Sequence, residues 1–591
     1  MSVNSVKDDE FLSSVNKKYT LLRLFKYLLA YKYPILAVIV IMIITVSISI
    51  ANPLIIERAI DVHITERDYD SLLILGGFAI GINIIFVLLV KLRMYLMAKI
   101  SNKVLLTIRQ ELYTHIQKLS FSFFDSRPTG KILARIIGDV NSLKDVLSNS
   151  VTTLIPDFVT ICAVVIIMMA KNWRLALASL ISLPIMMFGL WFIQTRSHIR
   201  WRNHRKKSSN LNAFIHEDLS GMRIIQSYTA EEETGESFDV LLKEHRDSFV
   251  SAVKLNDAFG PVIDISWGIG VFSMYYVAIT LLGVNVRNVG TLIAFAYFIS
   301  MFWRPIMNLS NFYNQLITNV TGAERIFEIL DTKPDILDDE KVMQLPEIKG
   351  SVRFEQVSFA YDADTKVLND VSFHIKPGET IALVGPTGAG KTTIVNLISR
   401  FYDVQEGNIL IDGYNIKDVS IESLRMQMGI MTQDNFLFSG TIKDNIRYGK
   451  LDATDDEITA AAKAVNAHDF IMKLEKGYDT ELQERGNGLS IGQRQLLAFA
   501  RTMVSMPKIL ILDEATSSID THTELLVQQG IEALLKGRTS FVIAHRLSTI
   551  RKADRIFVID DGQIKEEGNS DELLAKKGFY YNLYMAQFKN L

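Results

Sequence analysis

The sequence predicts a chain in two parts, an all-α domain of membrane-crossing helices followed by an α/β domain. Long apolar stretches recur between residues 34 and 312, and from about residue 350 short apolar strands alternate with helical segments. Apolar residues make up 49% of the chain and the mean hydropathy is +0.19, which is high for a protein that is soluble throughout. At 591 residues the chain is also too long for a single hydrophobic core.

Six stretches are long and apolar enough to cross the hydrocarbon layer, which takes roughly 20 residues of helix. They cover residues 34–56, 71–96, 150–170, 173–195, 259–283 and 289–312. The first stretch carries no charged residue. The segment before it, YTLLRLFKYLLAYKY, alternates apolar and basic residues at helical spacing, and it predicts a helix lying in the membrane interface.

The connections between these stretches predict the topology. The first connection, ERAIDVHITERDYD, is short and acidic, whereas segments 97–149 and 196–258 are long and rich in Lys and Arg, as in RSHIRWRNHRKK from Arg196. The positive-inside rule therefore places the long connections and both chain ends in the cytoplasm. Helical periodicity broken near Gly and Pro predicts membrane helices that continue into the cytoplasm, with a short transverse helix at each bend where a cytoplasmic domain could dock.

Charged residues within the apolar stretches require an explanation because they are costly in hydrocarbon. Asp157, Asp264 and Arg304 either line a substrate cavity, or lie near helix ends or pair with one another, and the sequence leaves both interpretations open. The single cysteine, Cys162, excludes an internal disulfide and is expected to be a small buried apolar residue. The polar N-terminus does not resemble a signal peptide, and a net charge of −2 gives no reason to expect nucleic acid as a partner.

The α/β part contains a phosphate-binding P-loop in its required setting. The strand TIALV leads into GPTGAGKT and then into an amphipathic helix. Glycines let backbone N–H groups approach phosphates, and the helix N-terminus adds a favourable dipole. Lys391 is expected to reach the β- and γ-phosphates of ATP, and the Thr392 hydroxyl to bind Mg²⁺. The predicted nucleotide-binding residues of this loop are Gly385, Pro386, Thr387, Gly388, Ala389, Gly390, Lys391, Thr392 and Thr393.

A second acidic motif follows about 120 residues later in KILILDEATSSID. Asp513 ends an apolar strand and is expected to hold Mg²⁺, directly or through water. Glu514 comes next, where it can polarise a water that attacks the γ-phosphate. A strand that ends in two acids is a weak signal alone and a strong one beside a P-loop.

The order of P-loop, Gln433, LSIGQ, ILILDE and His545 resembles the ABC transporter ATPases. With six apolar stretches ahead of it, the chain resembles the ABC exporters of the multidrug, lipid and peptide group over roughly residues 20–585. Without this resemblance, Tyr361 and His545 could equally have purely structural roles. The resemblance implies that Tyr361 stacks on adenine, Gln433 touches Mg²⁺ and the attacking water, His545 contacts the γ-phosphate, Asp520 crosses the dimer interface, and Ser490, Gly492 and Gln493 close over ATP bound to the opposite subunit.

One residue departs from the family pattern, because Ile491 stands where the signature LSGGQ has glycine. A β-branched residue adds bulk and disfavours positive φ. Either this is tolerated drift, or the chain is the half of a heterodimer that keeps Glu514 and His545 while its partner keeps LSGGQ and lacks the glutamate.

These observations predict a tail and interfacial helix at 1–33, a six-helix transmembrane domain at 34–325, a linker at 326–349 and an ABC nucleotide-binding domain at 350–591. The expected function is ATP-driven export of an amphiphilic or hydrophobic substrate by alternating access, as one half of a dimeric exporter in which a heterodimer is favoured over a homodimer. An ATP-gated channel or a membrane-anchored regulatory ATPase is the alternative. The expected location is a bacterial plasma membrane, with the ATPase domain in the cytoplasm, ATP and Mg²⁺ as cofactors, the lipid bilayer as a partner and no nucleic acid.

Overall fold

The computed structural model describes residues 17–280, 289–338, 342–361, 365–432, 435–513, 521–543 and 547–588. These residues form two compact units. The first unit holds the described residues up to Gln117 together with Thr129–Thr332, and the second holds Lys118–Pro128 and the described residues from Lys333 onward.

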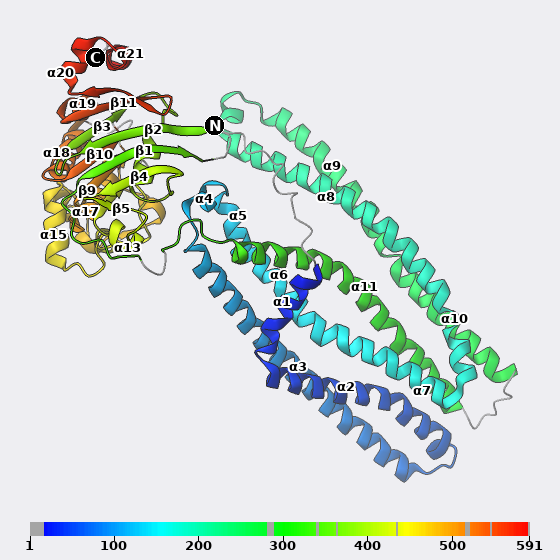
Figure 1. The fold of residues 1–591 in the computed structure, drawn as a ribbon. Helices are drawn as coiled ribbons and strands as arrows, with labels where there is room; N and C mark the ends of the chain where they lie inside the picture. The colour runs from blue at the N-terminus through cyan, green and yellow to red at the C-terminus, as the bar shows by residue number, and fades with distance from the viewer. Residues whose placement is uncertain are drawn as a thin grey trace. The chain divides into compact units, whose positions relative to one another are not determined.

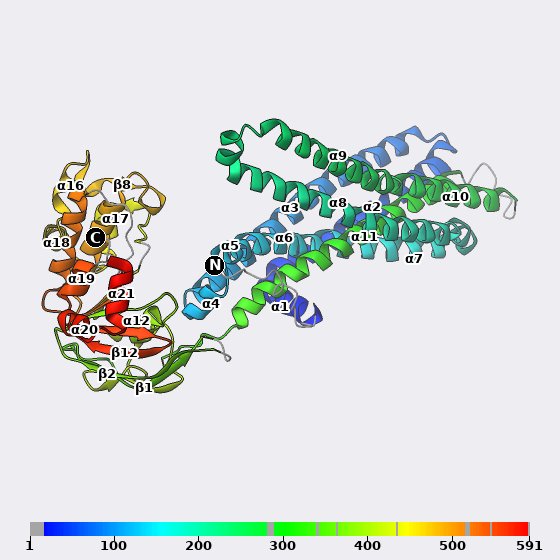
Figure 2. The same ribbon diagram turned by 90° about the horizontal axis from the view of Figure 1, so that it is seen from above.

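The first unit is entirely helical (Figure 1). Each of the six predicted apolar stretches lies in helical segments as far as it is described, apart from a turn at residues 181–182 within the fourth; residues 281–283 of the fifth lie outside the described residues. Helices α8 and α9 run side by side in both views (Figures 1 and 2). The α-helices are α1 (Lys17–Leu29), α2 (Lys32–Arg58), α3 (Tyr69–Ile116), α5 (Thr129–Ala134), α6 (Val140–Asn149), α7 (Ile155–Leu180), α8 (Leu183–Ser227), α9 (Glu231–Asn256), α10 (Phe259–Thr280) and α11 (Val289–Asp331), with π-helical segments at Ala59–Ile64, Arg135–Asp139 and Ser150–Leu154.

Length and composition mark four helical stretches among the described residues as able to cross a membrane. The apolar part of α11, Val289–Met301, is shorter. In α8 the apolar run ends early because Arg196 and Arg200 follow it. The four stretches are Lys32–Ile64, Tyr69–Ile116, Thr129–Leu180 and Glu231–Thr280.

The third and fourth apolar stretches are joined at Asn172 without a loop. Asn172 has a non-helical backbone (φ −159°, ψ 101°) inside α7. Its Oδ1 accepts hydrogen bonds from the backbone N–H groups of Arg174 at 3.1 Å and Leu175 at 3.3 Å. An asparagine that caps a new helical turn in this way reverses the chain in very few residues.

The two bends predicted to be cytoplasmic differ from each other. A short helix, α4 (Phe121–Asp125), lies at the first bend, as the sequence predicts. The second prediction is wrong, because α8 passes into α9 through a tight turn in which Thr229 has a left-handed backbone (φ 54°). Three glutamates, beginning at Glu231, lie in the first turn of α9. Their negative charge complements the helix dipole and stabilises a helix that begins directly after the turn.

A polar network joins the C-terminal end of α2 and the π-helical segment after it to Lys171, beside the kink within α7, and to the N-terminus of α11, near the connection predicted to face outward. Lys171 forms an ion pair with Glu57 at 2.6 Å. Asp61 accepts hydrogen bonds from the backbone N–H groups of Gly290 at 2.6 Å and Thr291 at 2.9 Å. A carboxylate at these positions caps the N-terminus of α11 and complements its dipole.

The charged residues within the apolar stretches have different environments. Asp157 lies in the first turn of α7, near a helix end, and accepts a hydrogen bond from the Asn308 side-chain amide at 2.8 Å, a bond to neither of the other two charged residues. Asp264 is exposed on α10, and the Arg304 side chain lies outside the described residues. Cys162 is exposed on α7, so the expectation of a buried cysteine is wrong. On a helix surrounded by lipid, an apolar residue gains as much from an outward position as from an inward one.

The second unit contains two main β-sheets (Figure 1). An antiparallel sheet has the order β2-β1-β4-β5, and a six-stranded sheet has the order β12-β11-β3-β10-β9-β6, in which only β12 is antiparallel. Buried parallel strands read as continuous apolar runs, as TIALV does. The strands are β1 (Val352–Ala360), β2 (Lys366–Ile375), β3 (Thr380–Val384), β4 (Glu406–Ile411), β5 (Tyr414–Asn415), β6 (Met428–Met431), β7 (Gly440–Thr441), β8 (Glu481–Leu482), β9 (Ile509–Asp513), β10 (Thr539–Ile543), β11 (Arg555–Asp560) and β12 (Gln563–Gly568).

The helices of the second unit cover these sheets and complete two hydrophobic cores. One core lies between the two sheets, around Phe354 and Phe557, and the other packs the six-stranded sheet on helices around Phe499. Besides α4, the helices are α12 (Lys391–Ile398), α13 (Ile421–Arg425), α14 (Ile442–Arg447), α15 (Asp455–Ala464), α16 (His468–Met472), α17 (Ile491–Val504), α18 (Thr521–Leu535), α19 (Leu547–Lys552), α20 (Ser570–Lys576) and α21 (Phe579–Phe588).

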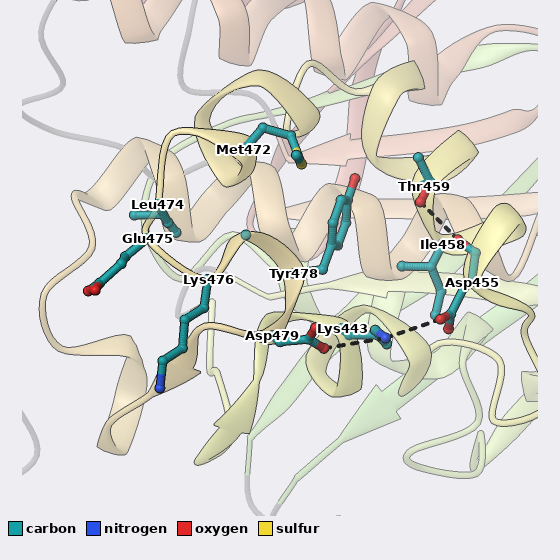
Figure 3. Close-up of a pocket in the computed structure, with 11 residues that line it drawn as sticks. Lys443, Asp455, Ile458, Thr459, Met472, Leu474, Glu475, Lys476, Tyr478 and Asp479 are labelled. Atoms are coloured by element: carbon teal, nitrogen blue, oxygen red, sulfur yellow. Dashed lines mark hydrogen bonds and ion pairs between the residues drawn. The ribbon is translucent and has the colours of Figure 1, made fainter.

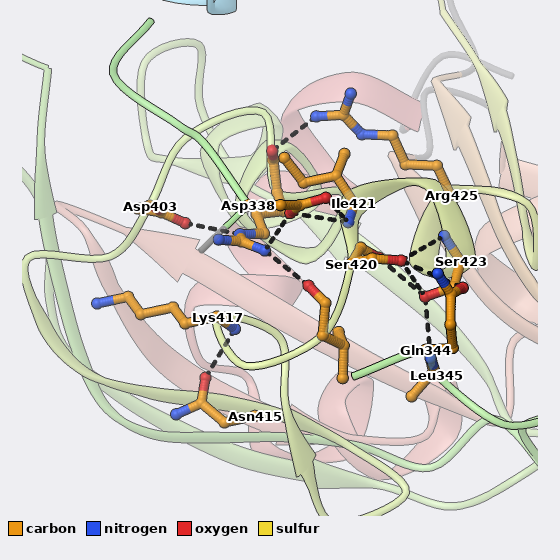
Figure 4. A network of polar contacts seen from close by, with 12 residues as sticks. Asp338, Gln344, Leu345, Asp403, Asn415, Lys417, Ser420, Ile421, Ser423 and Arg425 are labelled. Atoms are coloured by element: carbon orange, nitrogen blue, oxygen red, sulfur yellow. Dashed lines mark hydrogen bonds and ion pairs between the residues drawn. The ribbon is translucent and has the colours of Figure 1, made fainter. Parts of the chain in front are cut away.

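The chain that precedes β1 is fixed to the second unit by a polar network (Figure 4). The Leu345 backbone N–H donates to the Ser423 hydroxyl at 2.9 Å. Asp338 accepts a hydrogen bond from the Ile421 backbone N–H at 3.1 Å and lies 3.6 Å from the guanidinium of the buried Arg400. These bonds fix Asp338 and Leu345, two described residues of the predicted linker, on the domain that follows them.

Candidate nucleotide-binding site

The loop between β3 and α12 is shaped by glycines. Gly385 and Gly390 have φ values of 155° and 105°, which favour glycine. A Cβ at Gly385 would lie 2.0 Å from the Ile559 carbonyl oxygen of β11, and one at Gly390 would lie 2.8 Å from a Leu368 methyl carbon. Close approach to the sheet thus excludes side chains here, and the loop opens directly onto the N-terminus of α12, where backbone N–H groups and the helix dipole favour an anion.

Lys391 is the first residue of α12, and it is only 9% exposed. Its ammonium donates hydrogen bonds to the carbonyl oxygens of Gly385 at 2.6 Å and Pro386 at 2.8 Å. Burial lowers the pKa of the Lys391 ammonium, and the nearby Asp513 partly opposes this shift. The charge is therefore held inside the loop by neutral carbonyls, which phosphate oxygens can replace as stronger acceptors.

The strand register brings the acidic motif to the same edge of the sheet. Ile543 of β10 pairs with Leu383 of β3 on one side and with Asp513 of β9 on the other. All three strands are parallel, so their carboxyl ends open at one edge, which is where α/β sheets bind ligands. Thr392, exposed on the first turn of α12, adds a hydroxyl beside them. A hydroxyl, a carboxylate and phosphate oxygens are the hard oxygen donors that Mg²⁺ prefers, so these residues fit the ion.

Tyr361 lies at the end of β1 with 44% of its surface exposed. Its hydroxyl is 3.2 Å from the hydroxyl of Thr393, which is buried. Its ring meets the rings of Phe359 and Tyr402 edge-on, at 4.9 and 5.0 Å. These contacts fix the ring beside α12 and leave part of it free, as a base-stacking residue requires. The Thr393 hydroxyl is thus engaged with Tyr361.

The signature segment begins α17. Ser490 is the N-cap, whose hydroxyl accepts from the Gln493 backbone N–H at 3.2 Å, while the Gln493 side chain accepts from the Ser490 backbone N–H at 2.9 Å. Ile491 is the first helical residue, is 44% exposed and does not have a positive φ. The conformational objection to isoleucine is therefore wrong, and only its bulk at the helix N-terminus remains. Gly492 is buried.

The short helix α4 packs on the α/β domain within the second unit. The rings of Phe121 and Phe401 lie 4.9 Å apart. The Tyr402 hydroxyl donates a hydrogen bond to Asp125, and the Ser120 hydroxyl donates to Asp335 at 2.8 Å. Burial, followed by the bond to Asp125, raises the pKa of Tyr402. The first bend between membrane helices is thus a docking element, as the sequence predicts, and two of its partner residues, Phe401 and Tyr402, lie shortly after α12.

A separate pocket of about 500 Å³ lies among α14, α15 and α16 (Figure 3). Lys443 bridges Asp455 at 3.1 Å and Asp479 at 3.3 Å, and hydrogen bonds to these two carboxylates raise its pKa. The lining adds only one further lysine and one further acid, Lys476 and Glu475. Carboxylates outnumber cations there, so this pocket does not favour a polyphosphate.

Four predicted residues, Gln433, Glu514, Asp520 and His545, lie outside the described residues. The sequence also missed three neighbours of the site. Leu368 supports Gly390, Asn396 lies 3.5 Å from the Tyr361 hydroxyl, and Tyr402 joins that ring to the docking helix. Tyr402 could have been suspected because two aromatic residues directly follow the helix after the P-loop.

Comparison with known proteins agrees with this fold. Residues 35–306 match the family model of the ABC transporter transmembrane region, and residues 368–517 match the ABC transporter model. The chain is 43% identical over 571 residues to an uncharacterized ABC transporter ATP-binding protein, YknV, of Bacillus subtilis (strain 168), with 96% of this chain and 94% of the relative covered.

Two further comparisons extend the likeness. The chain is 41% identical over 495 residues to the ATP-dependent lipid A-core flippase of Syntrophus aciditrophicus (strain SB), with 84% of this chain and 82% of the relative covered. The structure of a bacterial Atm1-family ABC exporter with ATP bound superimposes with a TM-score of 0.76 at 29% identity, covering 94% of this chain and 98% of that chain.

The helical membrane unit and the α/β unit with its P-loop therefore define an integral, multi-pass membrane ATPase coupled to transport. The chain belongs to the ABC transporter family, as an exporter half-transporter whose transmembrane and ATPase domains are fused.

Proposed function

We propose that this chain is one half of a dimeric exporter that moves an amphiphilic or hydrophobic substrate out of the cytoplasm by alternating access. The observation that carries the proposal is the glycine loop that holds the Lys391 ammonium at the carboxyl edge of the six-stranded sheet. Support for the substrate class comes from apolar membrane helices with few charges and from the relative that carries the name of a lipid A-core flippase. Drugs, lipids and peptides all belong to this class.

In this proposal the residues of the loop bind the phosphates of ATP and Tyr361 stacks on its adenine. Thr392 and Asp513 hold Mg²⁺, which neutralises phosphate charge when bound. Glu514 orients the attacking water, while Gln433 and His545 contact the water and the γ-phosphate. These three roles come from the family pattern.

We further propose that the working pump is a heterodimer with one weak ATP site. Ser490, Gly492, Gln493 and Asp520 would serve ATP held by the partner subunit. Support comes from Ile491, because its exposed side chain stands on the first turn of α17, where a phosphate must approach closely. The weak site would then be the one that pairs this signature with the partner's P-loop.

The proposed division of the chain is that of the sequence prediction, with a linker at 326–349 and both termini in the cytoplasm of a bacterial cell. A channel gated by ATP, or a membrane-anchored regulatory ATPase, would hold the same nucleotide site. Flux of substrate against its gradient, driven by ATP in sealed vesicles, is expected of the exporter and of neither alternative.

The nucleotide roles are tested by a matched pair of variants in the purified, assembled transporter. Glu514→Gln is expected to keep ATP binding and to lose steady-state hydrolysis by at least about a hundredfold, because an amide orients water poorly. Lys391→Ala is expected to weaken ATP binding itself. Near-normal turnover of Glu514→Gln, or unchanged ATP affinity of Lys391→Ala, would remove the corresponding role.

The heterodimer is tested with Ile491→Gly and with the subunit composition of the purified complex. In a heterodimer the change raises ATP turnover little, because the partner's site lacks its own carboxylate. In a homodimer the change acts at two sites that each contain Glu514, so turnover rises clearly. A stable, transport-competent assembly of this chain alone would refute the heterodimer proposal.

A further inference from the structure

A basic groove runs between α8 and α9, which lie side by side in Figures 1 and 2. It has a volume of about 600 Å³ and is lined by Ile199, Arg200, Arg202, Asn203, Lys206, Ser248 and Ser251. Three of these residues are cations and none is an acid. We propose that this groove binds the phosphate-bearing headgroup of an anionic phospholipid from the cytoplasmic leaflet. The proposal does not depend on which substrate is exported.

Two of the three cations of the groove form no hydrogen bond or ion pair within the described residues. Arg200 donates a hydrogen bond to the Ser251 carbonyl at 3.2 Å and another to its hydroxyl, which ties α8 to α9. Arg202 and Lys206 are exposed and, within the described part of the chain, form no hydrogen bond or ion pair. An arginine fork and an ammonium one helical turn apart suit a phosphodiester, which accepts charge-assisted hydrogen bonds from both.

Neighbouring acids do not neutralise the groove. On α9, Glu244 is engaged by Lys207 at 2.7 Å and Asp247 by the adjacent Arg246 at 2.9 Å. No acidic residue occurs on α8 between Arg196 and Glu217. The groove therefore keeps an excess of positive charge, and Asn203 with the two serines adds neutral hydrogen-bonding groups at its walls.

The position of the groove along the helices favours a lipid over a free anion. Its residues lie 4 to 11 positions beyond the apolar run that ends at Thr195, and 8 to 11 positions before α10 begins at Phe259. At 1.5 Å per residue this is roughly 6–17 Å from the hydrocarbon, so the groove starts in the headgroup layer, which is about 5–8 Å thick on each side.

Long basic side chains also reach back toward the interface. Trp201, whose ring packs edge-on against Phe249 at 6.3 Å, belongs to the aromatic residues that collect at this level. Basic pockets beside membrane helices on the cytoplasmic side are the sites that acidic headgroups occupy.

The test counts lipids bound to the purified, assembled transporter by native mass spectrometry, with phosphatidylglycerol and phosphatidylcholine added in turn. The double variant R202A/K206A is compared with R205A/K243A, which removes the same charge from exposed positions of the same two helices that do not line the groove. Phosphatidylglycerol is expected to bind R202A/K206A roughly 10- to 30-fold more weakly than wild type, and R205A/K243A about as well as wild type. Phosphatidylcholine is expected to bind all three proteins alike.

Two results would overturn the proposal. Equal loss in both double variants would show general charge attraction, and no loss in R202A/K206A would show that the lipid binds elsewhere. Inorganic phosphate at millimolar concentration separates the two possible ligands: it is expected to leave bound phosphatidylglycerol unchanged. Displacement of the lipid by phosphate, absent in R202A/K206A, would identify a free-phosphate site and exclude the lipid assignment. The melting temperature of each variant checks that the helix pair is intact.

Discussion

Replacing Gly385 by alanine is expected to disable nucleotide binding through steric conflict with the sheet. The new Cβ would lie 2.0 Å from the Ile559 carbonyl oxygen, whereas ordinary contacts begin at about 3.4 Å. Ile559 is fully buried in β11, so the loop has to move by more than an ångström. Overpacking of this kind costs about 1–3 kcal/mol, and the unfavourable backbone adds about 1–2 kcal/mol.

The matched control is Gly388→Ala, in the same loop, because a Cβ there meets nothing within 4 Å although φ is 85°. The Gly388→Ala variant suffers only from the unfavourable backbone conformation, which corresponds to an ATP affinity roughly 5- to 30-fold weaker than that of wild type. In Gly385→Ala the steric overlap with β11 adds to the unfavourable backbone conformation, and together they cost about 2–5 kcal/mol. This variant is therefore expected to bind ATP at least about 30-fold more weakly than wild type.

Isothermal titration of the purified full-length variants with a non-hydrolysable ATP analogue measures both affinities, and melting temperatures show whether the domain stays folded. If Gly385→Ala bound the analogue as well as Gly388→Ala, contact between the loop and β11 would have no part in forming the site.

Three further outcomes follow from contacts described above. Tyr402→Phe removes the donor to Asp125 and is expected to raise amide exchange in α4 by about fivefold, since a hydrogen bond of this type contributes about 1 kcal/mol; unchanged exchange would show that the ring contacts alone hold the helix. Because burial lowers the pKa of Lys391 and bound phosphates favour its charged form, ATP affinity is expected to fall as pH rises through values below the ordinary lysine pKa of 10.5, and this fall should be absent in Lys391→Ala. Asp68→Cys is expected to react with an impermeant thiol reagent on intact cells that lack the native cysteine, and Arg127→Cys to be protected; the opposite pattern would invert the topology.

The sequence predicted the parts of the fold that depend on composition and local pattern. Apolar runs identified the membrane helices, and the strand–loop–helix order around Lys391 identified the phosphate loop, because both signals are contained in contiguous residues. The pairing of Ile543 with Asp513 could not be predicted, since strand register depends on contacts between residues far apart in the chain.

The errors have local physical causes. The short helix expected at the second bend is absent, because the turn at Thr229 leads directly into the acidic first turn of α9. The conformational argument about Ile491 was wrong because Ser490, and not the residue after it, holds the N-cap position. Both errors concern helix ends, which are the least certain part of any helix assignment.

The length of α3 has a mechanical consequence. It is a single helix of 48 residues, about 72 Å from end to end, without a proline to interrupt it. A stiff rod of this length acts as a lever, so a tilt of about 5° at one end displaces the other end by about 6 Å. Its glycines, Gly76, Gly77 and Gly81, are gathered near the end predicted to lie outside, where they make bending easiest, and the portion predicted to be cytoplasmic contains none. We therefore expect a movement of a few ångströms at the end predicted to be cytoplasmic to be carried along α3 to the part that contains the glycines.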